Sequence, residues 1–340
     1  MRKNICAARR MKVGALCGVV ALGAGMFVGC EEQNAEKANP ALQGTTNSAL
    51  QSSINPALQK FAEEALRDGI AQYGAADGCA IVMDVKTGTV LVRHGNVDER
   101  SELGSVIKPL TVAVAVELDS QKYGPDTVYK TDPDESGYEN LGGDGGHIWD
   151  ETMTVQEAVV KSSNIVISKL AYDIGPEVLR DGFARFGLVD TDSQNVWDKA
   201  NVAHIGIGHH IKVSPMQLVN AYRALAIAKD DGPVSPTTAK KVREMILDVA
   251  SPEGTARRAA IEGVKIAGKT GTAQKQVNGV YKPGLYRASF VGIVPADDPK
   301  YVIYVMLDFD RRTPYHQGGN SAGPVWRRIA MLMLGLKEPR

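Results

Sequence analysis

Two pairs of strand-like segments joined by short turns constrain the fold most. Near the C-terminal end, Arg287–Pro295 and Tyr301–Asp308 are apolar and β-branched, and they are joined around Ala-Asp-Asp-Pro. A link this short predicts antiparallel neighbours in one sheet. Earlier in the chain, Val82–Val85 and Thr89–Val92 are joined by Lys-Thr-Gly, which predicts a hairpin with Gly88 in the left-handed conformation. Among helical segments, such pairs predict an α+β domain.

Capping residues mark the start of several of these helices. Thr154 with Glu157, and Ser214 with Gln217, have the spacing of a capping box, in which each side chain bonds the other residue's backbone N–H. Pro324–Leu336 is predicted to form the last helix of the domain. The helices therefore alternate with, and follow, the antiparallel strands.

The N-terminal segment has the pattern of an export signal. Residues 1–12 carry five positive charges and no acid, and the apolar run at 13–29 follows. Phe-Val-Gly-Cys at 27–30 resembles the lipobox of bacterial lipoproteins, so 1–29 is predicted to be a lipoprotein signal peptide with Cys30 as the acylated residue. The alternative is an uncleaved membrane anchor. Both place the body outside the cytoplasm and attached to a membrane.

The segment at 30–54 is predicted to be a flexible polar tether. It is rich in Asn, Gln, Ser and Ala and holds no aromatic residue, which is typical of a chain that cannot form a core. A coil of this length spans on the order of 25–30 Å on average. Asn55 can cap a helix that starts at Pro56, so the folded domain is predicted at 55–340.

Charge and cysteine content exclude several classes of function. Without residues 1–29 the chain has 34 basic and 39 acidic residues, a net charge of −5, so nucleic acid is not an expected partner. Only Cys79 remains beside Cys30, and we expect it to be a small buried apolar residue. His204, His209 and His210 have no carboxylate or thiol at ligand spacing, so they are interpreted as solvated loop histidines and no metal is expected.

A serine and a lysine open an apolar helical run. Ser105 and Lys108 are three residues apart in SVIKPLTVAVAVEL, which places both side chains on one face of a helix. Serine needs a base to become a nucleophile, and a lysine kept neutral by burial and nearby cations can be that base. Chance placement of two common residues is the alternative. Pro109 removes an early N–H and predicts a local irregularity in this helix.

The tripeptide Ser162-Ser163-Asn164 has two interpretations. Serine and asparagine disfavour helix interiors, so the three residues could form a capped junction between two helices. Alternatively, Ser162 could relay a proton while the Asn164 amide fixes a substrate carbonyl. The local sequence alone favours the junction.

The tetrapeptide Lys-Thr-Gly-Thr occurs twice, in two different settings. The first copy, at 86–89, lies in the predicted hairpin turn. The second, Lys269–Thr272, lies in the strand-like VKIAGKTGTAQ, where Gly268 and Gly271 indicate close approach of another backbone or a ligand. A peptide could pair with this strand while Lys269 and the threonine hydroxyls meet a carboxylate.

Ser-x-x-Lys, Ser-x-Asn and Lys-Thr-Gly, in this chain order, resemble the motif set of penicillin-binding proteins and class A β-lactamases. AVVKSSNIVISKLA, VKIAGKTGTAQ and GGNSAGPVWRRIA are similar to segments of the transpeptidase domain of class B penicillin-binding proteins, and the resemblance runs over roughly residues 78–330. It implies the α+β penicillin-binding-protein (serine β-lactamase-like) fold, with an antiparallel sheet flanked by helices and an all-helical subdomain.

The resemblance also implies roles for the motif residues. Ser105 would attack the D-Ala-D-Ala bond of a peptidoglycan stem peptide, Lys108 would be the base, and Ser162, beside Asn164, would pass the proton to the leaving amine. The backbone N–H groups of Ser105 and Thr272 would form the oxyanion hole. Lys269, Thr270 and Thr272, with Gly271 between the threonines, would hold the terminal carboxylate, and Lys269 would help keep Lys108 neutral.

Peptidoglycan stem peptides, β-lactams and a membrane glycosyltransferase of the cell-wall machinery are the partners that the resemblance implies, with no cofactor. A D,D-carboxypeptidase differs only in using water in place of an amine. A β-lactamase-like hydrolase remains an alternative, although no Glu-x-x-Leu-Asn sequence lies between Ser162 and Lys269. The non-enzymatic alternatives are a β-lactam or muropeptide sensor and a cell-wall scaffold.

Overall fold

The computed structural model describes residues 56–132, 151–188 and 196–337. They all belong to Thr45–Arg340, one of two units into which the chain divides. The predicted signal peptide, Cys30, the tether and Asn55 lie outside the described residues. The helices are α2 Pro56–Tyr73, α3 Lys108–Leu118, α4 Val155–Lys161, α5 Asn164–Ile174, α6 Pro176–Arg185, α7 Lys199–Gly206, α8 Pro215–Ile227, α9 Pro236–Met245 and α10 Ala322–Met333.

Five strands form one antiparallel sheet in the order β2-β1-β7-β6-β5. They are β1 Asp77–Asp84, β2 Val90–His94, β5 Ala267–Val277, β6 Val280–Val294 and β7 Tyr301–Phe309, and β3 Val128–Lys130 pairs separately with β4 Thr152–Thr154. The predicted hairpin is confirmed, since β1 pairs with β2 and Gly88 has φ +74°. The predicted pairing of the two C-terminal strands is confirmed as well. β6 starts seven residues before the predicted segment and also pairs with β5, which carries Lys269.

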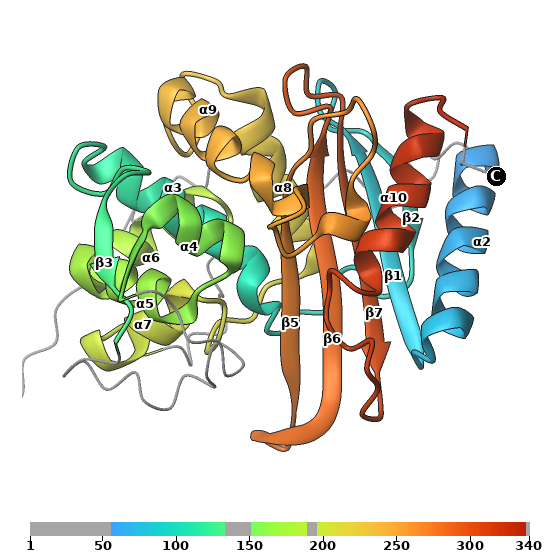
Figure 1. The fold of residues 1–340 in the computed structure, drawn as a ribbon, viewed down its shortest axis with the longest axis horizontal. Helices are drawn as coiled ribbons and strands as arrows, with labels where there is room; N and C mark the ends of the chain where they lie inside the picture. The colour runs from blue at the N-terminus through green and yellow to red at the C-terminus, as the bar shows by residue number, and fades with distance from the viewer. Residues whose placement is uncertain (1–55, 133–150, 189–195, 338–340) are drawn as a thin grey trace, which may run out of the picture. The chain divides into compact units, whose positions relative to one another are not determined.

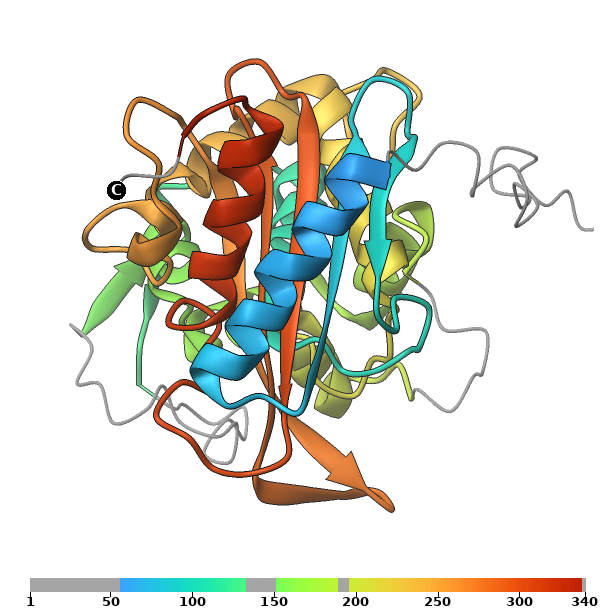
Figure 2. The ribbon, with the colours of Figure 1, turned by 90° about the vertical axis from the view of Figure 1, so that its right-hand side faces the viewer.

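Helices cover both faces of the sheet. α2 and α10 lie side by side on one face, as Figure 2 shows; α2 packs on β1 and β2, and α10 packs on β6 and β7. α8 packs on the opposite face (Figure 1). On the face that α2 and α10 cover, Trp326 of α10 is fully buried, its indole N–H donates to the Ile303 carbonyl at 2.9 Å, and its ring meets Phe290 edge-on. The sheet thus forms a rigid layer with β5 at its edge.

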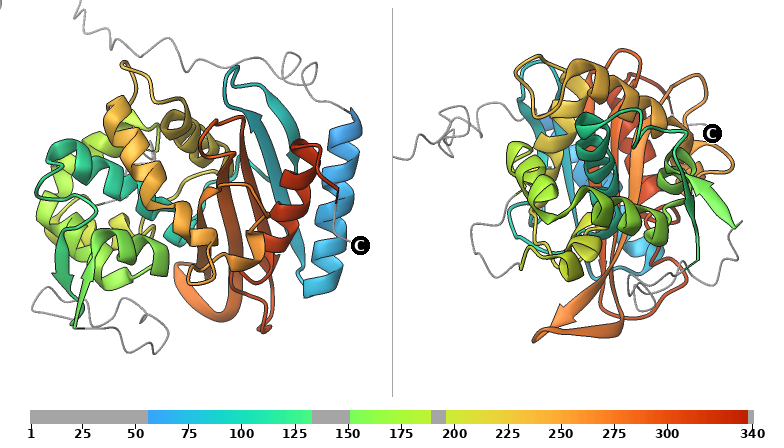
Figure 3. Two further views of the ribbon diagram at one scale, coloured as in Figure 1. Left: turned by 45° about the horizontal axis from the view of Figure 1, so that its top comes forward. Right: turned by 90° about the vertical axis from the view of Figure 1, so that its left-hand side faces the viewer.

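The remaining helices form a separate cluster beyond the β5 edge. α3, α5, α6 and α7 pack against one another, with α4 and α9 next to them (Figure 3). α3 is buried along almost its whole length, because Lys108–Val116 are all inaccessible. This arrangement confirms the expected α+β architecture with an all-helical part. Among the described residues, no helix combines the length and the apolar character needed to cross a bilayer.

Local sequence signals predicted the starts of α4 and α8 correctly. Both capping boxes are present, with Thr154 beginning α4 and Ser214 beginning α8. The last helix begins two residues earlier and ends three residues earlier than predicted. Cys79 is fully buried and unpaired, and burial raises the pKa of its thiol to about 12, so it is the inert apolar residue that was expected.

Candidate active site

Ser105 lies in a tight turn that leads into α3. Gly104–Ile107 form a 3₁₀ turn, and the Lys108 N–H donates to the Ser105 carbonyl. Residues three apart in such a turn face the same side, as predicted for Ser105 and Lys108. The irregularity expected at Pro109 takes the form of this 3₁₀ turn: α3 begins only at Lys108, so Pro109 lies in its first turn, where the N–H needs no partner within the helix.

Close backbone contacts hold this turn between a loop and the sheet. Gly104 has φ +64°, and its N–H donates to the Gly208 carbonyl at 3.3 Å. A Cβ on Gly208 would lie only 2.1 Å from the Gly104 carbonyl oxygen, and a Cβ on Gly104 would lie 3.3 Å from the Thr272 oxygen. The Tyr222 hydroxyl donates to the Val106 carbonyl at 2.8 Å. Ser105 is therefore fixed directly beside β5 at Thr272.

The Ser-Ser-Asn tripeptide is a helix junction, as the local reading favoured. α4 ends at Lys161, Ser162 takes the left-handed conformation with φ 63°, and the Ser163 hydroxyl accepts from the Val166 N–H at the start of α5. This left-handed residue allows the Lys108 amine to reach both the carbonyl and the hydroxyl of Ser162, at 2.6 and 3.2 Å. The Asn164 amide oxygen accepts from the same amine at 2.6 Å. The residues that join α4 to α5 are thus the same residues that bind the Lys108 amine.

A second buried lysine meets the same hydroxyl. Lys269 and Lys108 are both fully inaccessible, and the Lys269 amine donates to the Ser162 hydroxyl at 2.8 Å and to the Thr270 carbonyl at 3.1 Å. Burial, with added repulsion from Lys108, holds the pKa of Lys269 well below its ordinary value. Two charged ammonium groups around the Ser162 hydroxyl are therefore disfavoured. Lys108 and Lys269 together carry fewer protons than two exposed lysines would.

The hydrogen-bond partners fit a shared proton. A neutral Lys108 amine has two N–H bonds, enough for the Ser162 and Asn164 carbonyl oxygens, and its lone pair then accepts from a hydroxyl. The Ser162 O–H can donate to one lysine while it accepts from the other. A proton can therefore move between the two amines through Ser162 without leaving any of these groups unbonded.

β5 presents its motif to the site from the edge of the sheet. Lys269 to Thr272 pair with β6 on one side, and no strand pairs on the other side within the described residues. Position 271 has room only for glycine, since a Cβ there would lie 2.4 Å from the Ser289 hydroxyl and 2.9 Å from the Leu103 carbonyl oxygen. An open strand edge of this kind can pair with an extended peptide.

Sequence reasoning missed the residues that support the β5 threonines. The Thr255 and Thr270 hydroxyls are 2.8 Å apart, and the Thr272 hydroxyl accepts from the Gly318 N–H at 3.3 Å. Thr255 belongs to none of the three motifs. Gly318 opens the segment GGNSAGPVWRRIA, whose resemblance to the family is the one sequence signal that could have pointed to it.

The interpretation of the histidines as solvated loop residues is wrong for His204 and His209. His204 lies in α7 with its Nδ1 atom buried, and burial lowers its pKa to about 4. His209 lies in the loop that follows α7. Its ring is largely enclosed beside the lysine pair, and burial, with smaller contributions from His204 and Lys108, lowers its pKa to about 4. His204 and His210 stack, with ring centroids 4.7 Å apart. Across residues 56–132, 151–188 and 196–337 no group of three His, Cys, Asp or Glu side chains could hold a metal.

The structure thus joins Lys108, Ser162, Asn164, Lys269 and Thr270 in one hydrogen-bonded network. Ser105, Gly271 and Thr272 lie next to this network through the contacts of the 3₁₀ turn with β5. Three motifs that are separate in the sequence therefore meet at one place, which the fold creates by inserting the Ser-x-x-Lys turn between α5 and the sheet edge.

Comparisons with known proteins agree with this geometry. A family model described as the penicillin binding protein transpeptidase domain matches residues 78–331. The probable peptidoglycan D,D-transpeptidase PenA of Neisseria flavescens is 29% identical over 316 residues, which cover 79% of this chain and 78% of that protein. The transpeptidase domain of Burkholderia pseudomallei penicillin-binding protein 3 has a TM-score of 0.70 and 30% identity, covering 84% of this chain and 98% of that chain.

Other relatives are longer than this chain. The peptidoglycan D,D-transpeptidase FtsI of Escherichia coli is 28% identical over 78% of this chain, but the match covers only 52% of FtsI. The matched part corresponds to the folded residues that carry the three motifs. This chain belongs to the penicillin-binding protein transpeptidase family, and its α+β fold is the fold of that domain.

Proposed function

We propose that this protein is a serine-type peptidoglycan D,D-transpeptidase that cross-links stem peptides and is acylated by β-lactams. The main support is the Ser162 hydroxyl, which lies 3.2 Å from the Lys108 amine and 2.8 Å from the Lys269 amine. A hydroxyl between two buried amines can take up and release a proton within one catalytic cycle.

In the acylation step, the Ser105 hydroxyl oxygen attacks the carbonyl carbon of the penultimate D-Ala. Its proton passes to the neutral Lys108 amine, and the oxyanion is held by the backbone N–H groups of Ser105 and Thr272. When the amide bond breaks, Ser162 donates a proton to the leaving amine and is reprotonated from the lysine pair. The terminal D-Ala leaves, and an ester to Ser105 remains.

The groups on β5 hold the terminal carboxylate during this step. The Thr270 and Thr272 hydroxyls face it, and the Lys269 amine, 3.4 Å from the Thr270 hydroxyl, orients that hydroxyl from behind. The Asn164 amide orients both the substrate and the Lys108 amine. In the second step, an amine of a neighbouring stem peptide attacks the ester carbonyl and forms the cross-linking amide. Its proton passes through Lys108 to the departing Ser105 oxygen, which restores the free serine and the neutral lysine.

The N-terminal residues give the enzyme its location. Residues 1–29 act as a lipoprotein signal peptide, Cys30 carries the lipid, and 30–54 form the tether to the catalytic domain at 55–340. The protein is exported and stays on a membrane. A tether spanning on the order of 25–30 Å keeps the site near membrane enzymes such as a cell-wall glycosyltransferase.

Intact-mass spectrometry with benzylpenicillin tests the proposed nucleophile and base. The native chain is expected to gain the mass of one penicillin, and Ser105→Ala and Lys108→Ala are expected to gain none. Ser120→Ala and Lys240→Ala, which change exposed residues of the same types, should be labelled like the native chain. An unlabelled native chain contradicts the enzyme hypothesis.

Incubation with a stem pentapeptide and an amine acceptor tests the reaction itself. A cross-linked dimer supports transpeptidation. Tetrapeptide without dimer contradicts it and identifies a D,D-carboxypeptidase. Absence of both products, together with an absent penicillin adduct, leaves only the scaffold or sensor role.

A further inference from the structure

The carboxylate of Glu102 joins three separate segments of the chain beside the active site. It accepts from the Tyr281 hydroxyl at 2.8 Å, the His210 backbone N–H at 2.9 Å and the Gln276 side-chain amide at 3.1 Å. Glu102 itself lies three residues before Ser105, in the segment that leads into the 3₁₀ turn. None of these contacts takes part in the proton transfers of the proposed mechanism, so they serve another purpose.

Two of the three donors belong to a ribbon that extends beyond the rest of the sheet (Figure 2). Within the described residues, β6 pairs with β7 only from Tyr286 onward, so β5 and β6 form a two-stranded ribbon at Gln276 and Tyr281. These two residues are directly opposite each other, which places both side chains on the same face of the ribbon. A two-stranded ribbon is only marginally stable alone, so its position beside the site depends on contacts outside the sheet.

The third donor belongs to a loop that is anchored to α7. His210 takes the left-handed conformation with φ +56°, which is uncommon for a residue with a side chain. Its ring stacks on His204, and its Nδ1 atom lies 3.2 Å from the Asn201 amide oxygen. Glu102 therefore connects the ribbon to a segment whose position α7 already fixes.

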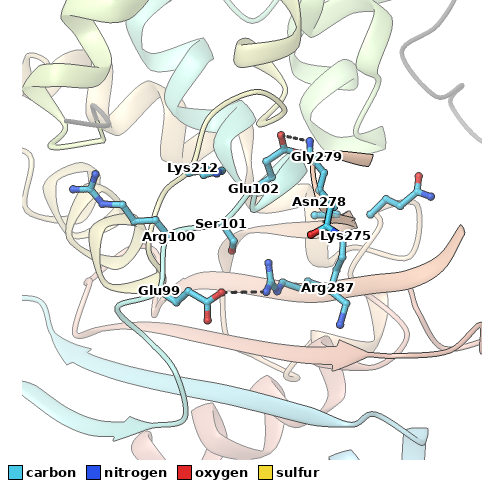
Figure 4. Close-up of a pocket in the computed structure, with 12 residues that line it drawn as sticks. Glu99, Arg100, Ser101, Glu102, Lys212, Lys275, Asn278, Gly279 and Arg287 are labelled. Carbon is cyan, nitrogen blue, oxygen red and sulfur yellow. Dashed lines mark hydrogen bonds and ion pairs between the residues drawn. The ribbon is translucent and has the colours of Figure 1, made fainter. Parts of the chain in front are cut away.

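The Glu102 carboxylate differs from the nearby Glu99 carboxylate in its partners. Burial, together with Glu102, raises the pKa of Tyr281 above its ordinary value, so this hydroxyl keeps its proton and stays a donor. Glu99 is exposed and contacts Arg287 at 3.6 Å, and Arg287 is held at 3.1 Å by Asp308 as well. Figure 4 shows Glu99 facing Arg287, while Glu102 points to the hairpin end of β5. An exposed pair such as Glu99 with Arg287 stabilises little.

We infer that Glu102 is a positioning residue for the oxyanion hole, because it connects the Ser105 turn to the β5–β6 ribbon and so fixes the gap between the two backbone N–H donors. The inference rests on the proposed function, which places those donors at Ser105 and Thr272. Ser105 follows Glu102 by three residues and Thr272 precedes Gln276 by four, so the contact between Glu102 and Gln276 closes a short ring through both donors. Donors of this kind need to be held within about 0.5 Å of the productive geometry.

Two reagents without any stem-peptide side chain test this role on the full chain. Benzylpenicillin acylates Ser105, and stopped-flow measurements separate the rate constant of acylation from the dissociation constant of the complex that precedes it. Phenylacetamidomethylboronic acid adds to the Ser105 oxygen, whose proton passes to Lys108, and the tetrahedral adduct places an oxygen in the oxyanion hole. Tighter binding of such an adduct reports interactions that form only in the transition state.

Glu102→Gln is expected to slow acylation about tenfold, since a displaced donor costs less than the 10²–10³ lost with a deleted one. Glutamine offers one oxygen to three donors, so the ribbon loses part of its attachment. The boronic acid should bind about tenfold more weakly, whereas the dissociation constant of the penicillin complex should not change. Glu99→Gln, the matched control in the same segment, should leave all three quantities at their native values.

Tyr281→Phe provides an independent measurement, which also serves if Glu102→Gln lowers the thermal stability of the domain. It removes one donor to the carboxylate and should slow acylation, but it should add little in the Glu102→Gln background, because the two residues act through one contact. A native acylation rate in Glu102→Gln, an equal loss in Glu99→Gln, a change in the dissociation constant alone, or additive effects with Tyr281→Phe would overturn the inference. Failure of the proposed function is distinguishable, since the native chain itself would then form no penicillin adduct.

Discussion

Replacing Lys269 with methionine should change how the stability of the domain depends on pH. Lys269 is fully inaccessible and shares the Ser162 hydroxyl with Lys108, and both burial and the second amine disfavour its charged form. The unfolded chain has no such constraint. Methionine fills a similar volume without a titratable group, so Lys269→Met isolates the contribution of this one amine.

The sign and size follow from proton linkage. Between the lowered pKa of the folded state and the ordinary value of 10.5, the unfolded chain binds a proton that the folded chain lacks. The free energy of unfolding of the native chain therefore rises with pH in this window, by up to about 1.4 kcal/mol per pH unit from this group. Below the lowered pKa of Lys269 in the folded state, the native chain bears the full cost of burying the lysine charge. The stability of Lys269→Met relative to the native chain is therefore greatest at these pH values.

Urea unfolding of both proteins at about pH 7, 8, 9 and 10 measures the effect. The difference between the two free energies of unfolding should change with pH in favour of the native chain as pH rises. Lys240→Met, at an exposed position, should show a difference that does not depend on pH. A pH-independent difference for Lys269→Met as well would mean that this amine titrates alike in both states, and the shared proton of the lysine pair would be refuted.

Three further outcomes are expected. Gly208→Ala should destabilise the domain by several kcal/mol and slow acylation, because its Cβ would meet the Gly104 carbonyl oxygen at 2.1 Å. Gly187→Ala, also at positive φ but in open space, should cost only about 1–2 kcal/mol. Equal thermal shifts for the two variants would contradict the clash. Ser162→Ala should lower the rate of penicillin acylation by about 10²–10³ in stopped-flow measurements, with thermal unfolding little changed; an unaltered rate argues against the relay. Cys30→Ala should move the protein from the membrane to the soluble fraction of exporting cells and abolish labelling by a fatty-acid probe; retention of both would favour the uncleaved anchor.

Local patterns predicted the parts of the fold that depend on neighbours in the sequence. The capping box at Thr154 needs only Glu157, and the β1–β2 hairpin needs only the residues around Gly88. The three motifs of the site were also local, and their order along the chain was enough to connect them. The Ser-Ser-Asn tripeptide forms the predicted helix junction, and the left-handed Ser162 that ends α4 also brings its hydroxyl to the two lysines, which is the geometry that the relay hypothesis requires.

Contacts between distant segments could not be predicted in this way. Glu102 receives donors from His210, Gln276 and Tyr281, which are more than a hundred residues away, and no spacing rule connects such positions. His209 was misjudged because loop side chains are usually solvated, whereas this loop packs against the Ser105 turn. At Pro109 the missing N–H predicted an irregularity, but not that it would be a 3₁₀ turn that places the start of α3 at Lys108.

The edge of β5 with which no described strand pairs has a consequence for the behaviour of the protein in concentrated solution. Backbone groups that can receive a peptide can equally receive a strand from a second molecule, because main-chain hydrogen bonds do not depend on side-chain identity. Self-association through this edge would then compete with catalysis, and turnover per molecule would fall with crowding while the fold stays intact. Attachment to a surface, which limits how two copies can approach, would protect the same edge that makes the reaction possible.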